Sequence, residues 1–152
     1  MKALGEGYAK FGSVFVRLAL GTAFLSAVAD RFGLWGPFGA PNVGWGDFAR
    51  FEAYTGELNW FLPAAMIPAL AWIATGAETL LGVLLIVGWK TREAALGSGV
   101  LLSLYAVTMT LALGVEAPLN FSVFSAAAGG FVLASCARFP LSLDALIEAV
   151  RP

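Results

Sequence analysis

Two ionisable side chains stand alone in long apolar stretches, where charge is expensive. Arg17 is the only charged residue between about residues 12 and 29, and Glu78 is the only one between 61 and 89. Inside a bilayer such a group costs at least ~2.5–3.5 kcal/mol, so it should face other helices and find a partner. With a rise of 1.5 Å per residue, the two lie about 8 and about 15 Å from the same end of their helices. This placement predicts an Arg17–Glu78 ion pair.

The predicted pair has two interpretations. Thr75 and Thr79 flank Glu78 and would complete a polar core. In the first interpretation, the pair only fixes the packing of the helices, as buried ion pairs do in other proteins. In the second, Arg17, Glu78, Thr75 and Thr79 bind an amphipathic molecule such as a quinone headgroup, or supply a protonatable carboxylate coupled to electron transfer. The sequence leaves both interpretations open.

A second polar cluster follows the first apolar stretch. One interpretation is anchoring at the membrane surface, with exposed ion pairs that contribute little stability. The other is a functional loop that folds over the outer mouth of the protein as a lid, above a ligand site. The members of this cluster are Asp30, Arg31, Trp35, Trp45, Asp47 and Asn120.

The composition excludes several classes of function. Of 152 residues, 59% are hydrophobic and 12% are charged, which is typical of a membrane protein. A net charge of −1 gives no reason to expect a nucleic-acid partner. With no histidine and one cysteine, Cys136, the chain lacks the ligands for common metal centres and the residues of a serine–histidine–aspartate site, so we expect no metal. We expect no covalent cofactor either; redox activity would need a bound quinone or a partner subunit. The sequence does not decide whether the chain is an enzyme and indicates no catalytic residue.

Four apolar stretches approach the roughly 20 residues that a helix needs to cross a bilayer. They predict helices at about 12–29, 61–89, 94–115 and 118–137, in a single membrane domain over residues 1–152. We therefore expect an all-α integral membrane protein built as a four-helix bundle. We interpret the first stretch as a retained helix, not a signal peptide, because Arg17 interrupts it.

Shorter elements are expected outside the spans. The outer loop, 30–60, is rich in glycine and proline in its first half, which predicts turns. From Trp45 onward, aromatic residues recur every three positions, which predicts a short helix lying at the membrane surface. A second amphipathic helix is expected at 142–150, with Ser142 as its N-cap.

Lys and Arg in short loops predict the orientation. Six basic residues fall on the side that holds both ends of the chain and two on the other, so we expect both termini in the cytoplasm. The six are Lys2, Lys10, Lys90, Arg92, Arg138 and Arg151, and the two are Arg31 and Arg50.

Helix contacts in membranes favour small residues, which let backbones approach closely. Glycines at such positions are therefore expected to pack between helices. We expect this of Gly76, Gly82 and Gly88, of Gly97 and Gly99, and of the run Ala126–Gly130.

Taken together, these segments resemble the DoxX family of small bacterial membrane proteins, from about residue 11 to residue 137. The segments that carry the resemblance are Arg17-Leu-Ala-Leu-Gly21, Asp30-Arg31-Phe-Gly33-Leu-Trp35-Gly36, Ala74-Thr-Gly-Ala-Glu78-Thr-Leu-Leu-Gly82 and Pro118-Leu-Asn-Phe-Ser-Val-Phe-Ser125. By position, the intramembrane Arg and Glu of that family fall on Arg17 and Glu78.

The resemblance implies a four-helix bundle in the bacterial inner membrane. It also implies an accessory subunit in quinone-linked redox metabolism that binds a small amphipathic ligand. Its partners would be the lipid bilayer, other membrane or soluble redox subunits, and further copies of itself. The alternative is a non-catalytic structural or assembly subunit of a membrane complex. A transporter is a weaker alternative, because one intramembrane acid without a relay of others makes a poor conduit.

Overall fold

The computed structural model describes residues 2–150, and side chains from residue 7 onward. Residues 1, 151 and 152 of the predicted domain, with Arg151 and the side chain of Lys2, lie outside the described part. No strand occurs among the described residues, so the expectation of an all-α protein is confirmed. The helices are α1 (Lys2–Arg31), α2 (Phe48–Leu58), the 3₁₀ turn η1 (Ala64–Met66), α3 (Ile67–Val87), α4 (Thr91–Leu113), α5 (Glu116–Asn120), α6 (Val123–Ser135) and α7 (Leu143–Val150).

Three segments are long and apolar enough to cross a membrane: Gly7–Arg31, Ala64–Val87 and Thr91–Leu113. The prediction of one fourth helix over 118–137 is wrong. The helix is interrupted at Ser122, whose φ of 55° is left-handed and incompatible with a continuous right-handed helix. The part beyond the break, α6, is apolar but has only 13 residues. The number of four crossings therefore stays a prediction.

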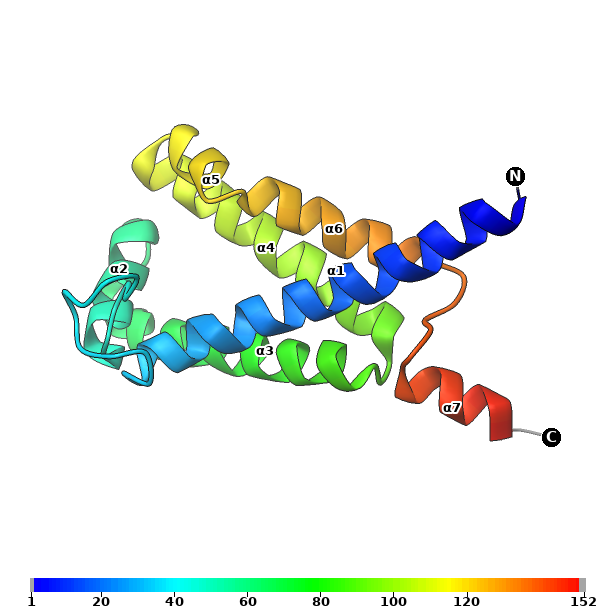
Figure 1. The fold of residues 1–152 in the computed structure, drawn as a ribbon. Helices are drawn as coiled ribbons and strands as arrows, with labels where there is room; N and C mark the ends of the chain where they lie inside the picture. Colours follow the sequence, from blue (N-terminus) through cyan, green and yellow to red (C-terminus); the bar gives the residue numbers. More distant parts are fainter. Residues whose placement is uncertain (1, 151–152) are drawn as a thin grey trace.

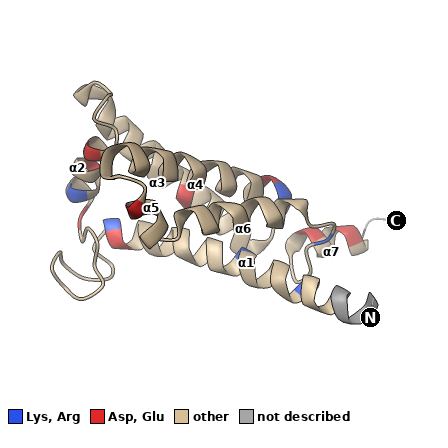
Figure 2. Ribbon diagram, turned by 90° about the horizontal axis from the view of Figure 1, so that it is seen from above, with Lys and Arg blue, Asp and Glu red and all other residues tan. Residues whose placement is uncertain are grey.

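The helices form two closely packed pairs, α1 with α3 and α4 with α6 (Figure 1). A short turn joins α3 to α4, and these two helices diverge toward the end of the bundle that carries α2 and α5. We call this the α2 end. The described chain starts and finishes at the opposite end, near α7, which we call the α7 end. Most charged residues gather at these two ends, and the middle is nearly free of them (Figure 2).

Glycines set the spacing within both pairs. A Cβ on Gly21 would lie 3.1 Å from the carbonyl oxygen of Gly82, so α1 and α3 touch at this level. A Cβ on Gly130 would lie 2.7 Å from the backbone nitrogen of Gly99, which places α4 and α6 in backbone contact. The expected packing role is wrong for Gly76, which faces open space.

The predicted outer loop, 30–60, folds as a series of turns followed by α2. Asp47 caps α2, because its carboxylate accepts a hydrogen bond from the backbone of Arg50 at 2.9 Å. Phe51 is buried against Ala71 and Ala74 of α3. The expected short helix is therefore present. The expectation that its aromatic side lies in the lipid headgroups is wrong for Phe51, because that ring packs on the bundle.

At the α7 end, the last helix is fastened to the turn between α3 and α4. Ser142 caps α7 as expected, accepting a hydrogen bond from the backbone of Ala145 at 3.1 Å. The Asp144 carboxylate accepts hydrogen bonds from the backbone nitrogens of Lys90 and Thr91 at 2.9 and 2.8 Å, and so caps α4. Gly88 ends α3 with a φ of 73°, and a Cβ there would collide with Ser142.

The attachment of α7 is expected to depend on pH. Burial disfavours the charge of Asp144, but the backbone hydrogen bonds of Thr91 and Lys90 and the charge of Arg17 outweigh it and lower the pKa. A lowered pKa in the folded state stabilises the attachment above the ordinary pKa of about 3.9, and this contribution is lost as pH falls through the lowered pKa. Hydrogen-exchange protection factors of α7 should therefore be constant down to about pH 4 and fall below it.

The variant Asp144→Asn is the control for this prediction. Its α7 should already have lower protection at neutral pH, with no further loss on acidification. Full protection of the wild-type helix well below pH 3 would contradict the assigned role of the carboxylate.

Candidate functional site

A fully buried ion pair joins the end of α1 to the middle of α3. Nη2 of Arg31 donates to both carboxylate oxygens of Glu78 at 2.7 Å, and the two side chains are 2–3% exposed. Nη1 of Arg31 donates to the hydroxyl of Thr75 at 2.9 Å, and Tyr105 of α4 donates its hydroxyl to Glu78 at 2.6 Å. We call these four residues the Arg31–Glu78 cluster. It ties three helices together with balanced charge.

Aromatic rings cover the side of this cluster that faces α2. The guanidinium carbon of Arg31 lies 3.7 Å from the ring centroid of Phe51 and 5.4 Å from that of Trp45. A guanidinium over an aromatic face is stabilised by the ring quadrupole, more so where water is excluded. Residues of α2 and of the loop before it therefore complete the environment of a charge that belongs to α1.

The predicted Arg17–Glu78 pair is wrong. Contact between Gly21 and Gly82 sets the register of α1 on α3, and in this register Arg17 lies about 12 Å beyond Glu78 along the helices. Helical side chains also lean toward the N-terminus of their own helix, so Arg17 reaches away from Glu78. Its Nη2 donates instead to the carbonyl oxygen of Leu141 at 2.5 Å. Arg31 leans in the same direction along α1, but it lies on the other side of Glu78 and therefore reaches toward it.

Of the two threonines, only Thr75 joins the cluster. The Thr75 side chain is buried, accepts from Arg31 and donates to the carbonyl of Ala71 at 2.9 Å. Thr79 lies on an exposed face of α3, and its hydroxyl donates to the carbonyl of Thr75 at 2.7 Å. This bond within one helix is common for threonine in membrane helices.

The predicted outer cluster is divided among several sites. Asp30 is buried and accepts hydrogen bonds from the backbone of Gly44 and Trp45 at 2.9 and 3.0 Å, which folds the loop back onto α1. Trp35 stays exposed while its indole nitrogen donates to the carbonyl of Ser26 at 3.0 Å. Asp47 caps α2, as described above. Asn120 is exposed at the end of α5 and does not join these residues.

Sequence reasoning missed Tyr105 as a partner of Glu78. The turn between α3 and α4 makes the two helices antiparallel, and a tyrosine on α4 leans back toward that turn and so toward the level of Glu78. The signal that could have found this contact was therefore the antiparallel arrangement of α3 and α4, together with the lean of the tyrosine side chain toward the turn. A single tyrosine among threonines and leucines does not reveal such a contact by its residue type.

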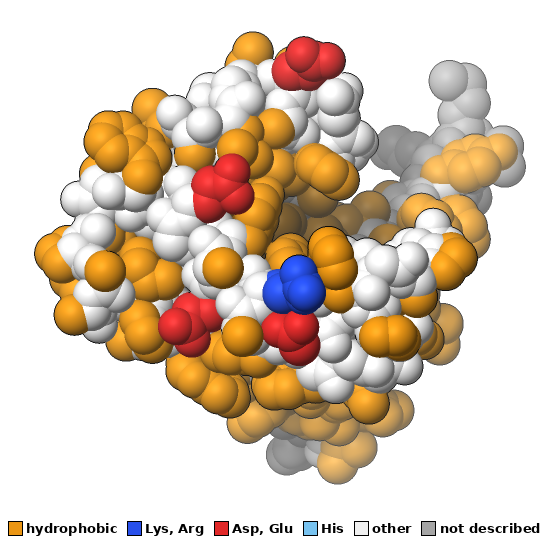
Figure 3. All heavy atoms as spheres, turned by 90° about the vertical axis from the view of Figure 1, so that its left-hand side faces the viewer, with side chains coloured by type: hydrophobic (Ala, Val, Ile, Leu, Met, Phe, Trp, Pro, Cys, Tyr) orange, Lys and Arg blue, Asp and Glu red, His pale blue; other side chains and the backbone are white. Residues whose placement is uncertain are grey.

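A cavity of about 520 Å³ lies beside the cluster at the α2 end. Its walls come from α2, the first half of α3, the second half of α4 and the segment around Phe121. Seen from that end, the molecule is hollowed between hydrophobic side chains, and acidic and basic side chains are scattered over the same face (Figure 3). Arg31 and Tyr105 line the cavity, but Glu78 does not, because they cover it. A volume of this size is within the range of small-molecule sites.

The lining of this cavity is mainly apolar, with a few polar groups. No cluster of three or more His, Cys, Asp or Glu that could hold a metal ion occurs among the described residues. Leucine, isoleucine, alanine and aromatic side chains make up most of the wall, and the polar groups of Arg31 and Tyr105 lie on one side of it. The arrangement can enclose an apolar molecule and orient it through a few hydrogen bonds.

Comparison with known proteins identifies one family. Residues 9–120 match the family described as "Methylamine utilisation protein MauE". No curated protein and no solved structure matches the chain. The resemblance to the DoxX family is therefore wrong. Its segments are short and apolar, and such segments recur in small membrane bundles for reasons of packing alone.

Proposed function

The chain belongs to the MauE family of membrane proteins, and from this we propose that it is an accessory protein of a membrane redox system for methylamine use. In this proposal its cavity at the α2 end binds a small amphipathic ligand. The observation that carries the binding role is the cavity of about 520 Å³ beside the buried Arg31–Glu78 cluster. Glu78 and Thr75 do not line the cavity themselves. In this proposal they act indirectly, because they position Arg31 and Tyr105, which do line it, through hydrogen bonds.

The proposal places the cavity on the outer side of the bacterial inner membrane. Basic residues support this orientation, because Lys10, Lys90, Arg92 and Arg138 belong to the α7 end, whereas Arg31 and Arg50 belong to the α2 end. By the positive-inside rule the α7 end faces the cytoplasm, with both termini. In a four-crossing arrangement, α5 and α6 together supply the fourth crossing, with the break at Ser122 near the outer surface.

A specific observation also favours a second candidate, a structural or assembly subunit. The carboxylate of Glu78 accepts three hydrogen bonds, two from Arg31 and one from Tyr105, so the cluster is largely satisfied without a ligand. A paired cluster of this kind can serve only to hold α1, α3 and α4 together. In this candidate role the cavity would be filled by a partner protein of the same redox system.

Growth of the source organism tests the accessory role. Disruption of the gene should abolish growth with methylamine as the sole nitrogen source and leave growth with ammonium unchanged. A plasmid copy of the wild-type gene should restore growth on methylamine. Equal growth of the disrupted and parent strains on methylamine would overturn the proposed function.

A further inference from the structure

The cavity carries polar side chains from the α2 region besides those of Arg31 and Tyr105. Tyr54 and Asn59 of the α2 region line it, and the hydroxyl of Tyr54 makes no hydrogen bond to any residue that the structure describes. Asn59 donates one hydrogen bond from its side-chain nitrogen to the carbonyl of Thr55 at 2.9 Å. Burial, with the charge of Glu57, raises the pKa of Tyr54, so its hydroxyl stays protonated and able to donate. Polar groups that are free to bond a ligand therefore line the cavity at the α2 end.

The rest of the wall is mainly apolar and follows the axes of α3 and α4; its polar members are Arg31, Thr55, Tyr105 and Thr108. On α3 it runs from Leu70 to Ala77, and on α4 from Met109 back to Leu101. At 1.5 Å per residue these stretches are about 10–12 Å long. This length is somewhat less than half of a hydrocarbon core of about 30 Å. The cavity thus offers a mainly apolar wall shorter than one leaflet, beside the polar groups of Tyr54 and Asn59.

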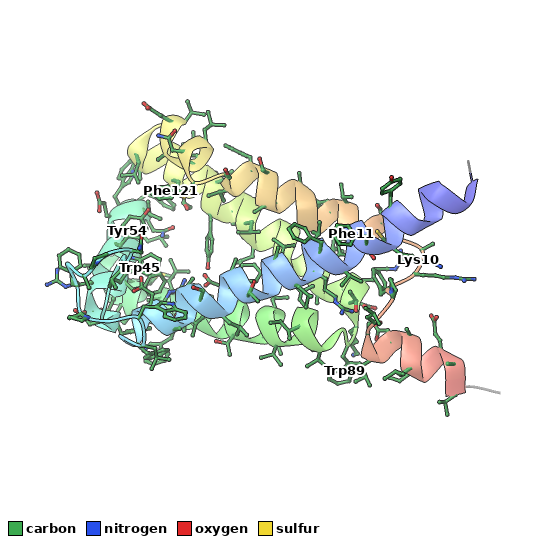
Figure 4. All side chains as sticks on the ribbon, in the orientation of Figure 1. Lys10, Phe11, Trp45, Tyr54, Trp89 and Phe121 are labelled. Atoms are coloured by element: carbon green, nitrogen blue, oxygen red, sulfur yellow. The ribbon has the colours of Figure 1, made fainter. Side chains whose placement is uncertain are left out.

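One side of the cavity opens outward between α3 and α4. Three of its wall residues are largely exposed on the surface: Ile73 by 67%, Leu104 by 57% and Phe121 by 74%. Tyr54 on α2 and Phe121 after α5 also line the cavity, and they come from the two separated sides of the α2 end (Figure 4). If α3 and α4 cross the membrane, exposed apolar residues of this kind face lipid, and the cavity is open to molecules dissolved in the bilayer.

Charge limits what the cavity accepts. Arg31 is the one charged residue in the described wall, and Glu78 already balances it at 2.7 Å. An ionised headgroup would lose water here and find no free counter-charge, which is costly in a low-dielectric site. The same argument excludes methylammonium, which would also meet the charge of Arg31. Methylammonium is also far too small to fill about 520 Å³.

We infer that the cavity binds an uncharged amphiphile from the bilayer, with its hydroxyl- or carbonyl-bearing head at Tyr54 and Asn59 and its apolar chain between α3 and α4. The inference rests on the proposed function, because it names the class of ligand that the proposed site takes. It commits to a neutral lipid, and the phospholipids of the surrounding membrane are the competing occupant.

Native mass spectrometry of the purified full-length protein in mild detergent tests this inference. The probes are monoolein, which is uncharged, oleate, which carries one charge on the same chain, and dioleoylphosphatidylcholine. We expect one monoolein per protein and at least tenfold weaker binding of the other two. Equal binding of oleate or of the phospholipid would overturn the uncharged class and leave the amphipathic ligand of the proposed function in place.

Two pairs of variants locate the binding. Ala77→Phe fills the apolar wall, and Ala69→Phe makes the same change on an exposed face of α3 that does not line the cavity. Only the first should lower monoolein binding, by tenfold or more. Tyr54→Phe should weaken it about fivefold, the worth of one hydrogen bond. Tyr8→Phe, at an exposed site near the other end, should leave it unchanged.

These variants keep the inference separate from the proposed function. Equal binding by Ala77→Phe and Ala69→Phe would overturn the site even if every variant supports growth on methylamine. Should Ala77→Phe fail to fold, Tyr54→Phe decides by itself, because it removes one oxygen and adds no volume. Growth of the disrupted strain on methylamine, in contrast, would contradict the accessory role and would say nothing about the class of ligand.

Discussion

Replacing Glu78 by glutamine is expected to destabilise the protein by about 3–5 kcal/mol, the range for breaking a buried ion pair from one side. The amide keeps the shape of the carboxylate but leaves Arg31 with a buried and uncompensated charge, since both side chains are 2–3% exposed. The measurement is the free energy of unfolding in mixed micelles, from titration with sodium dodecyl sulfate followed by far-UV circular dichroism.

Three further variants make the result specific. Glu57→Gln is the matched control, because Glu57 is exposed and should tolerate the same change at little cost. Tyr105→Phe removes one hydrogen bond to a charged group and should cost about 1.5–3 kcal/mol. The double variant Arg31→Met with Glu78→Leu removes both charges, and its stability should return most of the way to that of the wild type.

The double variant also keeps the prediction testable if Glu78→Gln does not fold. An unstable double variant would mean that packing at these positions, and not the lost counter-charge, explains the effect. A fully stable Glu78→Gln protein would mean that Arg31 has another anionic partner or reaches water. The buried carboxylate of Asp30 is the nearest candidate for such a partner in sequence.

The position of Glu78 was predictable, but its partner was not. One acid in a long apolar stretch must find a partner in the bundle, and this rule identified Glu78 correctly. Matching depths then favoured Arg17, because depth alone ignores the direction in which a helical side chain leans. Arg31 seemed to belong to a loop, but α1 continues to that residue and the chain after it folds back.

The lengths of the apolar stretches predicted the long helices, but they did not predict where a helix is interrupted. The sequence predicted α1, α3 and α4 because long apolar runs have few alternatives in a membrane. The break at Ser122 depends on one residue with a positive φ, which an apolar run does not announce. For the same reason, glycines were recognised as a class, while Gly76 and Gly130 differ only in what their helix faces happen to meet.

The cavity could not be predicted at all, because it results from the angle between two helices. The sequence contains the residues of its wall, but the same residues would close a tightly packed bundle if α3 and α4 ran parallel over their whole length. Where they diverge, α2 contacts both helices, and its Phe51 packs against Ala71 and Ala74 of α3. A segment expected at the membrane surface thus shapes the site.

The second large effect is expected at Gly130. A Cβ at this position would lie 2.7 Å from the backbone nitrogen of Gly99 and 3.0 Å from the carbonyl oxygen of Ala95, so α4 and α6 would have to separate. Gly130→Ala should therefore lower the free energy of unfolding by about 1–3 kcal/mol, as overpacking does. In the same micelle titration, Gly129→Ala is the control, because its Cβ would make an ordinary contact of 3.5 Å with Val16.

Gly129→Ala should even be slightly more stable than the wild type, by up to about 1 kcal/mol, because alanine is a better helix former than glycine. Equal effects at the two positions would show that helix propensity, and not contact between α4 and α6, controls stability here.

The displacement of α4 in Gly130→Ala should also affect the Arg31–Glu78 cluster. It moves α4 at Gly99, less than two turns from Tyr105, so the bond from Tyr105 to Glu78 should weaken with it. Adding Tyr105→Phe to Gly130→Ala should then cost less than Tyr105→Phe alone.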